Sequence, residues 1–221
     1  MGLLKSSVAR KVAMALSGLF LVFFLGQHFV INVSSVIDPE TFNSWSHFMG
    51  TNGVVQFLLQ PVLIFGVIFH FVMGFILELQ NRKARAVRYT SYKGHLSASW
   101  ASRNMLISGV VILAFLGLHF YDFWVPEIVY KYIESNPSDT ERYFPELVHK
   151  FESPVRVGLY CLAFVLLIFH LWHGFMSAFQ SVGFNNKYSR ALKGFTKFYA
   201  VLIPLGFVFI ALYHHFNQIP H

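Results

Sequence analysis

Five long stretches without a charged side chain recur along the chain, and they restrict its possible folds more than any other feature. The stretches cover residues 12–37, 41–77, 104–121, 157–186 and 198–221. A helix that crosses a bilayer needs about 20 consecutive, mainly apolar residues. Only 12% of the 221 residues are charged, against about 25% in a typical soluble domain. The sequence therefore predicts an all-α integral membrane protein.

Removing the polar ends of these stretches gives the predicted transmembrane helices. They lie near residues 11–33, 54–79, 104–125, 155–181 and 196–217, within a single domain that covers residues 1–221. The first apolar stretch exceeds 20 residues and no A-x-A-like cleavage site follows it. We therefore interpret it as a helix of the mature protein and not as a secretory signal.

The distribution of charge predicts how these five helices are oriented. Thirteen of the 17 Lys and Arg residues precede the first span or connect spans two to three and four to five, where Glu78 is the only acid. The other nine acids, from Asp38 to Glu152, fall on the opposite side. Because positively charged loops stay in the cytoplasm, the N-terminus is predicted to be cytoplasmic and the C-terminus to lie outside. The net charge of +7 mostly reflects this asymmetry and does not indicate nucleic-acid binding.

An internal repeat relates the first two spans to the next two. SGLFLVFFLGQHF at 17–29 aligns without a gap with SGVVILAFLGLHF at 108–120, and seven of the thirteen positions are identical. IFHFVMGF at 68–75 aligns in the same way with IFHLWHGF at 168–175. Each half of the repeat carries one aligned histidine in each of its two spans.

These histidines fall at two matched depths in the membrane. Counting 1.5 Å per helical residue from the ends of the spans places His28 and His119 in the outer half, and His70 and His170 in the inner half. An unpaired imidazole is costly in hydrocarbon, whereas two neutral imidazoles saturate a haem iron and suit it to electron transfer. The sequence therefore predicts two haems, an outer one held by His28 and His119 and an inner one held by His70 and His170.

Small and basic residues near the ligands are predicted to contact the haems. They are Gly74 and Gly174, four residues after the inner ligands; Gly26 and Gly117, two residues before the outer ligands; Ser17 and Ser108, eleven residues before the outer ligands; and Arg10 and Arg103. A flat macrocycle passes closest to a helix at a glycine, although small residues also serve ordinary packing between membrane helices. The serines lie level with the inner pair. We expect them to hydrogen-bond the propionates of the inner haem, with the arginines nearby.

His173 is a further candidate in the fourth span. It lies three residues after His170, and the repeat places Met73 at the equivalent position of span two. A ligand role is therefore not expected. We interpret His173 as a hydrogen-bonding residue beside the inner haem, with packing as the alternative.

Five motifs together resemble a known family. They are GQHFVIN in span one, FNSWSHFM in the outer loop, IFHFVMGF in span two, GLHF in span three and FHLWHGF in span four. The family is that of the dihaem cytochrome b membrane anchors of succinate:quinone oxidoreductases, which are succinate dehydrogenases and fumarate reductases. The match is closest to the single-subunit, five-helix type that works with menaquinone, and it covers nearly the whole chain except span five.

The resemblance implies a four-helix bundle that holds two non-covalent b haems in a bacterial cytoplasmic membrane. The pattern H-x-x-x-G in span four is the family's usual ligand arrangement and selects His170 over His173. The implied partners are a flavoprotein subunit, which performs the succinate chemistry of the tricarboxylic acid cycle, and an iron–sulfur subunit on the cytoplasmic face. This chain would pass electrons to quinone in the respiratory chain. Ile168 replaces a glutamate that some fumarate reductase relatives use for proton transfer, so the resemblance does not extend to that pathway.

The segment from Thr41 to Gln56 is predicted to contain the quinone site, level with the outer haem. Quinone chemistry needs hydrogen-bonding groups that exchange protons, and a histidine side chain can carry a proton near neutral pH. We select His47 and Asn43 as the candidate catalytic residues. The alternatives are a polar interfacial loop anchored by Trp45, or an inner quinone site beside the iron–sulfur subunit.

Two other functions remain open at this point. The chain could be the cytochrome b of another quinone-linked complex, such as a hydrogenase, a formate dehydrogenase or a quinol:cytochrome c reductase. In the last of these one helix supplies ligands to both haems, whereas here each of four helices supplies one. A histidine-based proton channel or transporter would need acidic partners within the spans, and only Glu78, at the end of span two, comes near.

Overall fold

The computed structural model describes residues 6–84, 105–134, 139–184 and 186–217, without the side chains of residues 82 and 84, and within these ranges it contains helices and no strand. Five helices are long and apolar enough to cross a membrane. They are Ser7–Ile37, Val55–Asn81, Met105–Tyr132, Pro154–Ser181 and Ser189–Phe216. These helices correspond one for one to the predicted spans, so the predicted all-α fold with five transmembrane helices is confirmed.

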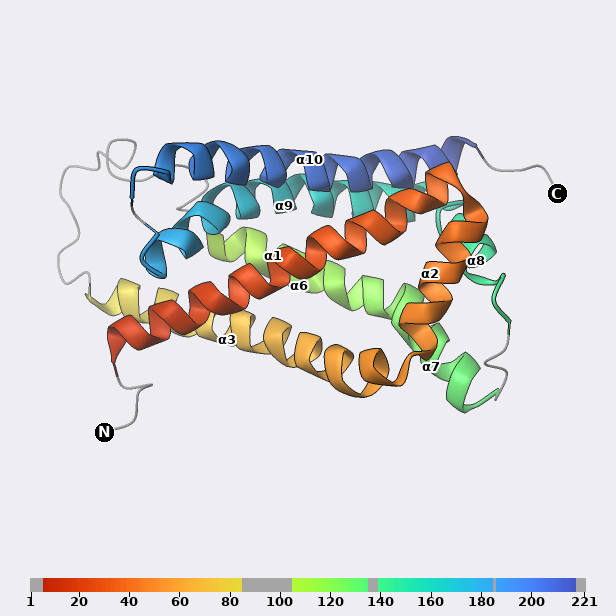
Figure 1. The fold of residues 1–221 in the computed structure, drawn as a ribbon, viewed down its shortest axis with the longest axis horizontal. Coiled ribbons are helices and arrows are strands. Elements are labelled where there is room, and N and C mark those ends of the chain that lie inside the picture. Colours follow the sequence, from red (N-terminus) through yellow and green to blue (C-terminus); the bar gives the residue numbers. More distant parts are fainter. Residues whose placement is uncertain (1–5, 85–104, 135–138, 185, 218–221) are drawn as a thin grey trace.

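The long helices lie side by side along the longest axis of the molecule (Figure 1). They are α1 (Ser7–Ile37), α3 (Gln60–Ala84), α6 (Met105–His119), α9 (Pro154–Ser181) and α10 (Ser189–Phe216). Helix α1 packs against α3, α9 and α10, and α9 packs against α6 and α10. We call the end where α1 begins the Ser7 end. The opposite end, where α1 and α10 both finish, is the α2 end.

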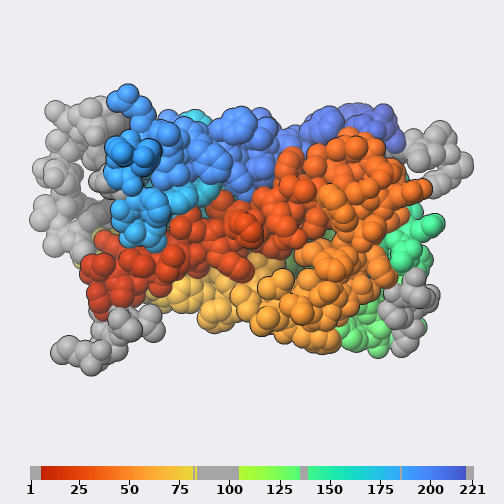
Figure 2. All heavy atoms as spheres, in the orientation of Figure 1, coloured from red at the N-terminus to blue at the C-terminus, as the bar shows by residue number. Residues whose placement is uncertain are grey.

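A short helix, α2 (Pro39–Thr51), follows α1 directly, where the sequence analysis considered a polar loop. Asp38 makes the junction: its backbone N–H donates to the Ser34 carbonyl at 2.8 Å, and its carboxylate accepts from the Thr41 N–H and hydroxyl. The Thr41 hydroxyl bond lowers the pKa of Asp38. Pro39 suits the first helical turn because that turn does not need its missing N–H. Helix α2 therefore turns back over the end of the bundle, as Figure 2 shows for this face.

Two wider helical turns interrupt the spans near the α2 end. The turn η2 (Val55–Leu59) precedes α3, and η3 (Phe120–Trp124) joins α6 to α7 (Val125–Tyr132). In each, an N–H bonds to the carbonyl five residues earlier, and such turns are frequent at functional sites. They shift the faces that α3 and α7 present to each other. The last short helix, α8 (Tyr143–Lys150), packs against α2.

The apolar core lies mostly toward the α2 end. Its buried residues are Phe42, Leu147, Phe151, Val157, Tyr160, Phe164, Ile203, Phe207, Ile210 and Ala211. His214 of α10 adds a buried polar link, because its Nε2 lies 2.8 Å from the Ser35 hydroxyl of α1. In contrast, no residue in the most apolar 18-residue stretch of the Val55–Asn81 span is buried inside the protein. The α2 end is thus the tightly packed end of the bundle.

Because α9 is predicted to cross the membrane, the connection before it and the connection after it should lie on opposite faces. In a Cys161→Ala background, we expect a cysteine at exposed Asn186 to label from the cytoplasm and one at exposed Glu152 from outside. Impermeant maleimide labelling of intact and inverted vesicles measures this. Labelling of both positions from the same face would show that α9 does not cross the membrane.

Candidate functional site

The structure brings the four span histidines together as two pairs. His70 of α3 faces His170 of α9, with ring centroids 6.4 Å apart and ring planes at 67°. His28 of α1 faces His119 of α6, with centroids 5.7 Å apart and planes at 83°. We call these the inner and the outer pair. All four side chains are partly accessible although they lie between helices.

Both separations are compatible with two imidazoles that share one metal. Two metal–imidazole bonds of about 2.0–2.1 Å on opposite sides of an ion separate the ring centroids by roughly 6 Å. No group of three or more His, Cys, Asp or Glu side chains within the described ranges could hold a free metal ion. Each pair therefore offers two imidazoles at a separation that suits one metal between them.

Ser17 and Ser108 contact the inner histidines themselves. The Ser17 hydroxyl lies 3.0 Å from Nδ1 of His70, and the Ser108 hydroxyl lies 3.3 Å from Nδ1 of His170. The sequence analysis expected these serines level with the inner pair but assigned them to propionates. It did not consider the imidazoles as partners, because residue spacing places them level with the pair but does not say what they touch.

The four glycines predicted to admit a macrocycle have different neighbours. A Cβ added at Gly74 would lie 3.2 Å from the Met14 methyl group, and one at Gly174 would lie 2.9 Å from that of Met105. At Gly26 it would lie 2.9 Å from the hydroxyl of Tyr199 of α10. At Gly117, which is exposed, it would meet nothing within 4 Å. A haem contact at these glycines stays a prediction.

Two further glycines, which the sequence analysis did not select, lie against the inner histidines. A Cβ at Gly18 would lie 3.2 Å from Cε1 of His70, and one at Gly109 would lie 3.7 Å from Cε1 of His170. The available signal was the Ser-Gly pair that opens both copies of the repeat. These glycines let the imidazoles approach α1 and α6.

The remaining inner candidates surround this pair less closely. His173 lies one turn from His170, and within the described part of the chain its ring makes no hydrogen bond. Nε of Arg10 is buried and has no hydrogen-bond partner among the described residues, which fits the expected contact with an anionic group. Arg103 lies outside the described residues.

The outer pair has weaker polar support. The Asn32 amide donates to the His28 carbonyl at 2.8 Å and lies 3.4 Å from both ring nitrogens of His28. Nδ1 of His119 is buried and has no partner. Aromatic rings surround the pair instead, among them Phe207 against His28 and Phe123 against His119.

A buried acid beside the outer pair was missed. Asp122 in η3 is 1% exposed, and one of its oxygens accepts from the Tyr160 hydroxyl at 2.9 Å and pairs with Nε of Arg156 at 3.0 Å. The Tyr160 ring also lies 6.3 Å from that of His119. The sequence analysis passed over Asp122 because it lies at the polar end of the third span.

The two quinone candidates lie on one face of α2, toward α8. The Asn43 side-chain oxygen accepts from the Phe144 N–H at 2.8 Å and so caps α8, whose own N-cap residue, Arg142, makes no side-chain capping bond. The His47 ring lies 6.2 Å from that of Tyr143, and its Nδ1 is buried without a partner. Asn43 therefore has a structural bond, whereas His47 keeps a free polar atom.

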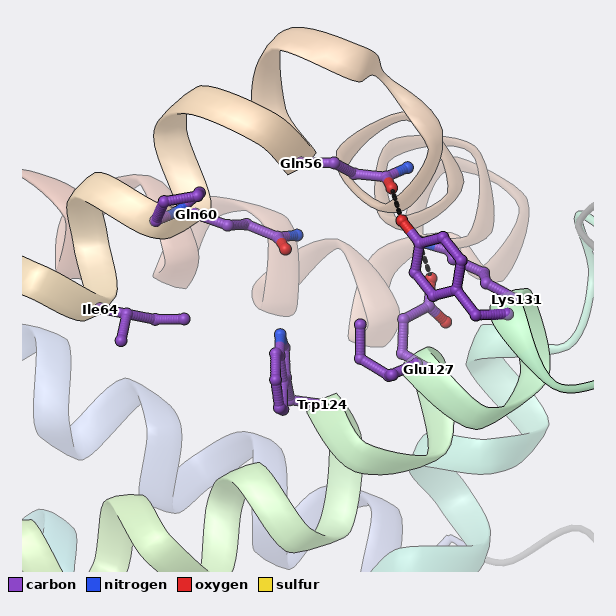
Figure 3. Close-up of a pocket in the computed structure, with 9 residues that line it drawn as sticks. Gln56, Gln60, Ile64, Trp124, Glu127 and Lys131 are labelled. Carbon is purple, nitrogen blue, oxygen red and sulfur yellow. Dashed lines mark hydrogen bonds and ion pairs between the residues drawn. The ribbon is translucent and has the colours of Figure 1, made fainter.

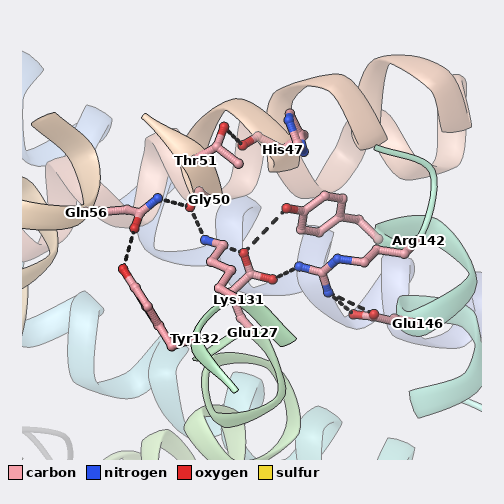
Figure 4. A network of polar contacts seen from close by, with 10 residues as sticks. His47, Gly50, Thr51, Gln56, Glu127, Lys131, Tyr132, Arg142 and Glu146 are labelled. Carbon is pink, nitrogen blue, oxygen red and sulfur yellow. Dashed lines mark hydrogen bonds and ion pairs between the residues drawn. The ribbon is translucent and has the colours of Figure 1, made fainter. Parts of the chain in front are cut away.

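A polar network joins α2 to α7 and α8 (Figure 4). Glu127 accepts from Lys131 at 2.5 Å, from Arg142, and from the Tyr143 hydroxyl at 3.4 Å. Burial raises the pKa of Tyr143, so that hydroxyl keeps its proton. Lys131 also donates to the Gly50 carbonyl of α2. One carboxylate thus compensates two nearly buried cations.

A pocket of about 150 Å³ adjoins this network. Figure 3 shows the Gln60 amide and the Trp124 indole pointing into the same space. The complete lining is Gln56, Gln60, Pro61, Ile64, Trp124, Glu127, Ile128, Lys131 and Tyr132. His47 and Asn43 do not line it. The pocket lies between the η2–α3 segment and the η3–α7 segment, and Trp124, its first lining residue in the third span, follows His119 by five residues.

Comparison with known proteins supports the resemblance carried by the motifs. The chain is 26% identical over 155 residues to the succinate dehydrogenase cytochrome b558 subunit of Bacillus subtilis (strain 168), which is 70% of this chain and 69% of that relative. No family model matches the chain, and no solved structure gives a significant match.

Glu127 and Glu146 both bind Arg142, but the network predicts that they contribute very differently to the free energy of unfolding. Glu127→Gln should lower the free energy of unfolding in detergent by about 2–4 kcal/mol, because it leaves Lys131 and Arg142 nearly buried without their shared carboxylate. The control Glu146→Gln removes a carboxylate that is 44% exposed and should cost less than about 1 kcal/mol. Equal losses in thermal unfolding would show that Glu127 does not hold the network.

Proposed function

We propose that this chain is the cytochrome b membrane anchor of a succinate:quinone oxidoreductase, either a succinate dehydrogenase or a fumarate reductase. Two b haems carry electrons between an iron–sulfur subunit and membrane menaquinone. The observation that carries the proposal is the pairing of four imidazoles, one from each of four helices, at two levels of the bundle. The Bacillus subtilis relative supports the kind of complex.

The residues fit two bis-histidine haems. His70 and His170 would hold the inner haem, and His28 and His119 the outer haem. A haem with two imidazole ligands supplies one-electron transfer without an open position for oxygen. The buried Nδ1 of His119, which has no partner, is consistent with a ring held through its other nitrogen.

The proposed partners bind at the Ser7 end. The positive-inside rule assigns this end to the cytoplasm of a bacterium, because most of the Lys and Arg residues belong to it. The iron–sulfur subunit would dock there beside the inner haem, and the flavoprotein subunit would perform the succinate chemistry. This chain performs electron transfer and the reaction with quinone.

A histidine-based proton relay has less support. It needs acids next to the histidines, and Asp122 is a buried acid near the outer pair. However, one oxygen of Asp122 is already paired with Arg156 and Tyr160. A visible spectrum of the purified protein separates the two functions, because only the cytochrome absorbs as a low-spin haem.

We place the quinone reaction at the α2 end, near the outer haem. The pocket offers the Gln60 amide and the Trp124 indole as donors to quinone oxygens. His47 is the titratable candidate in α2, and it connects to the pocket through the helix turn that ends at Gly50, whose carbonyl accepts from Gln56 and Lys131. Asn43 contributes by holding α8, and with it Tyr143, against α2.

The haem assignment predicts separable losses. His70→Ala or His170→Ala should remove the inner haem or convert it to high spin and leave the outer one, and His28→Ala or His119→Ala should do the reverse. His173→Ala is the matched control and should keep both haems low-spin. Absorption and electron paramagnetic resonance spectra measure this. Two low-spin haems in His170→Ala would contradict the assignment and favour His173.

The quinone assignment predicts a selective loss of turnover. In the assembled complex, His47→Ala should lower quinone-linked turnover at least tenfold, or about 1.4 kcal/mol of transition-state stabilisation. Haem content and succinate-driven reduction of an artificial acceptor should not change. Asn43→Ala should lower the same turnover together with stability. The control His149→Ala, at a side chain 75% exposed on α8, should have no effect. Unchanged turnover in both α2 variants would exclude this site.

A further inference from the structure

We propose that Ser17 and Ser108 are positioning residues for the inner haem, which fix the tautomer and orientation of His70 and His170 and strengthen both as iron ligands. The inference rests on the proposed function and goes beyond it. It assigns a role to two hydroxyl groups that the ligand set alone does not require.

The hydrogen bonds fix which atom donates. The Ser17 hydroxyl donates to the Met14 carbonyl at 2.8 Å, and the Ser108 hydroxyl donates to the Met105 carbonyl at 2.9 Å. A hydroxyl has one proton, so each serine can only accept from the imidazole Nδ1 beside it. Nδ1 therefore carries the proton, and Nε2 keeps the lone pair that binds a metal.

The neighbouring glycines fix the ring position. Gly18 follows Ser17, and Gly109 follows Ser108, and each leaves room for Cε1 of the histidine that its serine contacts. The hydroxyl and the missing Cβ thus define one edge of each imidazole. The same set occurs in both halves of the repeat, which gives two independent copies of the arrangement.

The arrangement is specific to the inner pair. Within the described residues, His119 has no partner at Nδ1, and the Asn32 amide reaches the His28 ring only at 3.4 Å. Each serine also contacts the histidine of its own half of the repeat. Ser17 of α1 contacts His70 of α3, and Ser108 of α6 contacts His170 of α9. Each half therefore orients its own ligand, and the inner haem joins the two halves.

A hydrogen bond that accepts from Nδ1–H makes the imidazole a stronger donor to its metal. Stronger donation favours the ferric form, so removal of the serine hydroxyl should raise the midpoint potential of the inner haem. The outer haem should keep its potential.

The test is a redox titration of the assembled complex carrying Ser17→Ala, Ser108→Ala or both. The inner haem is identified as the one lost in His170→Ala. We expect each single variant to raise the midpoint potential of the inner haem by up to about 59 mV. For a one-electron couple, this shift corresponds to a tenfold change in the reduction equilibrium constant. The double variant should show the sum, with altered low-spin ferric signals. Ser17→Thr should restore the potential because it restores the hydroxyl.

The control is Ser34→Ala, since Ser34 also donates to a carbonyl three residues earlier but contacts no histidine. It should leave both potentials unchanged. Loss of the inner haem in Ser17→Ala that Ser17→Thr restores would also support the role. Unchanged inner potentials, or a loss that threonine does not restore, would overturn it. Failure of the proposed function is distinguishable, because the unmodified protein would then lack two low-spin haems.

Discussion

The cost of an unpaired polar group in hydrocarbon is the constraint on which the rest of this structure depends. An imidazole without a partner costs on the order of 2–7 kcal/mol in an apolar environment. The structure brings four of the histidines in the spans together as two pairs, His70 with His170 and His28 with His119, and a metal held by each pair would take up one ring nitrogen of each histidine. The pairing in turn requires four helices at matched depths, which the repeat of two spans provides.

The two histidine pairs have different surroundings, and this difference distinguishes the two ends of the bundle. The inner pair has hydroxyl acceptors close to its Nδ1 atoms and lies where the helices pack less closely. The outer pair lies among aromatic rings of the buried core, near the Asp122 ion pair. Beyond it, α2, α7 and α8 form a polar cap around Glu127. An electron path between these levels would run from an accessible end toward a closed, polar one.

The sequence predicted the elements that follow from composition and spacing. Apolar length was sufficient for the five spans, and helical rise was sufficient to match the depths of the histidines. It did not predict α2, although the Asp38-Pro39 pair is a helix-start signal, because a polar segment between spans was interpreted as a loop. The turns η2 and η3 depend on packing between spans and have no local signature. The contact of Ser17 with the His70 imidazole depends on how α1 and α3 are rotated relative to each other. Residue spacing within one helix carries no information about that rotation.

The central claim is that each histidine pair holds one haem. The most direct test is the ratio of non-covalent haem to chain in the purified protein, measured by pyridine haemochrome absorbance together with low-temperature paramagnetic resonance. We predict two b haems per chain, both low-spin, with distinct signals. One haem per chain, a high-spin ferric signal from either, or protein that folds fully without haem absorbance would contradict the account.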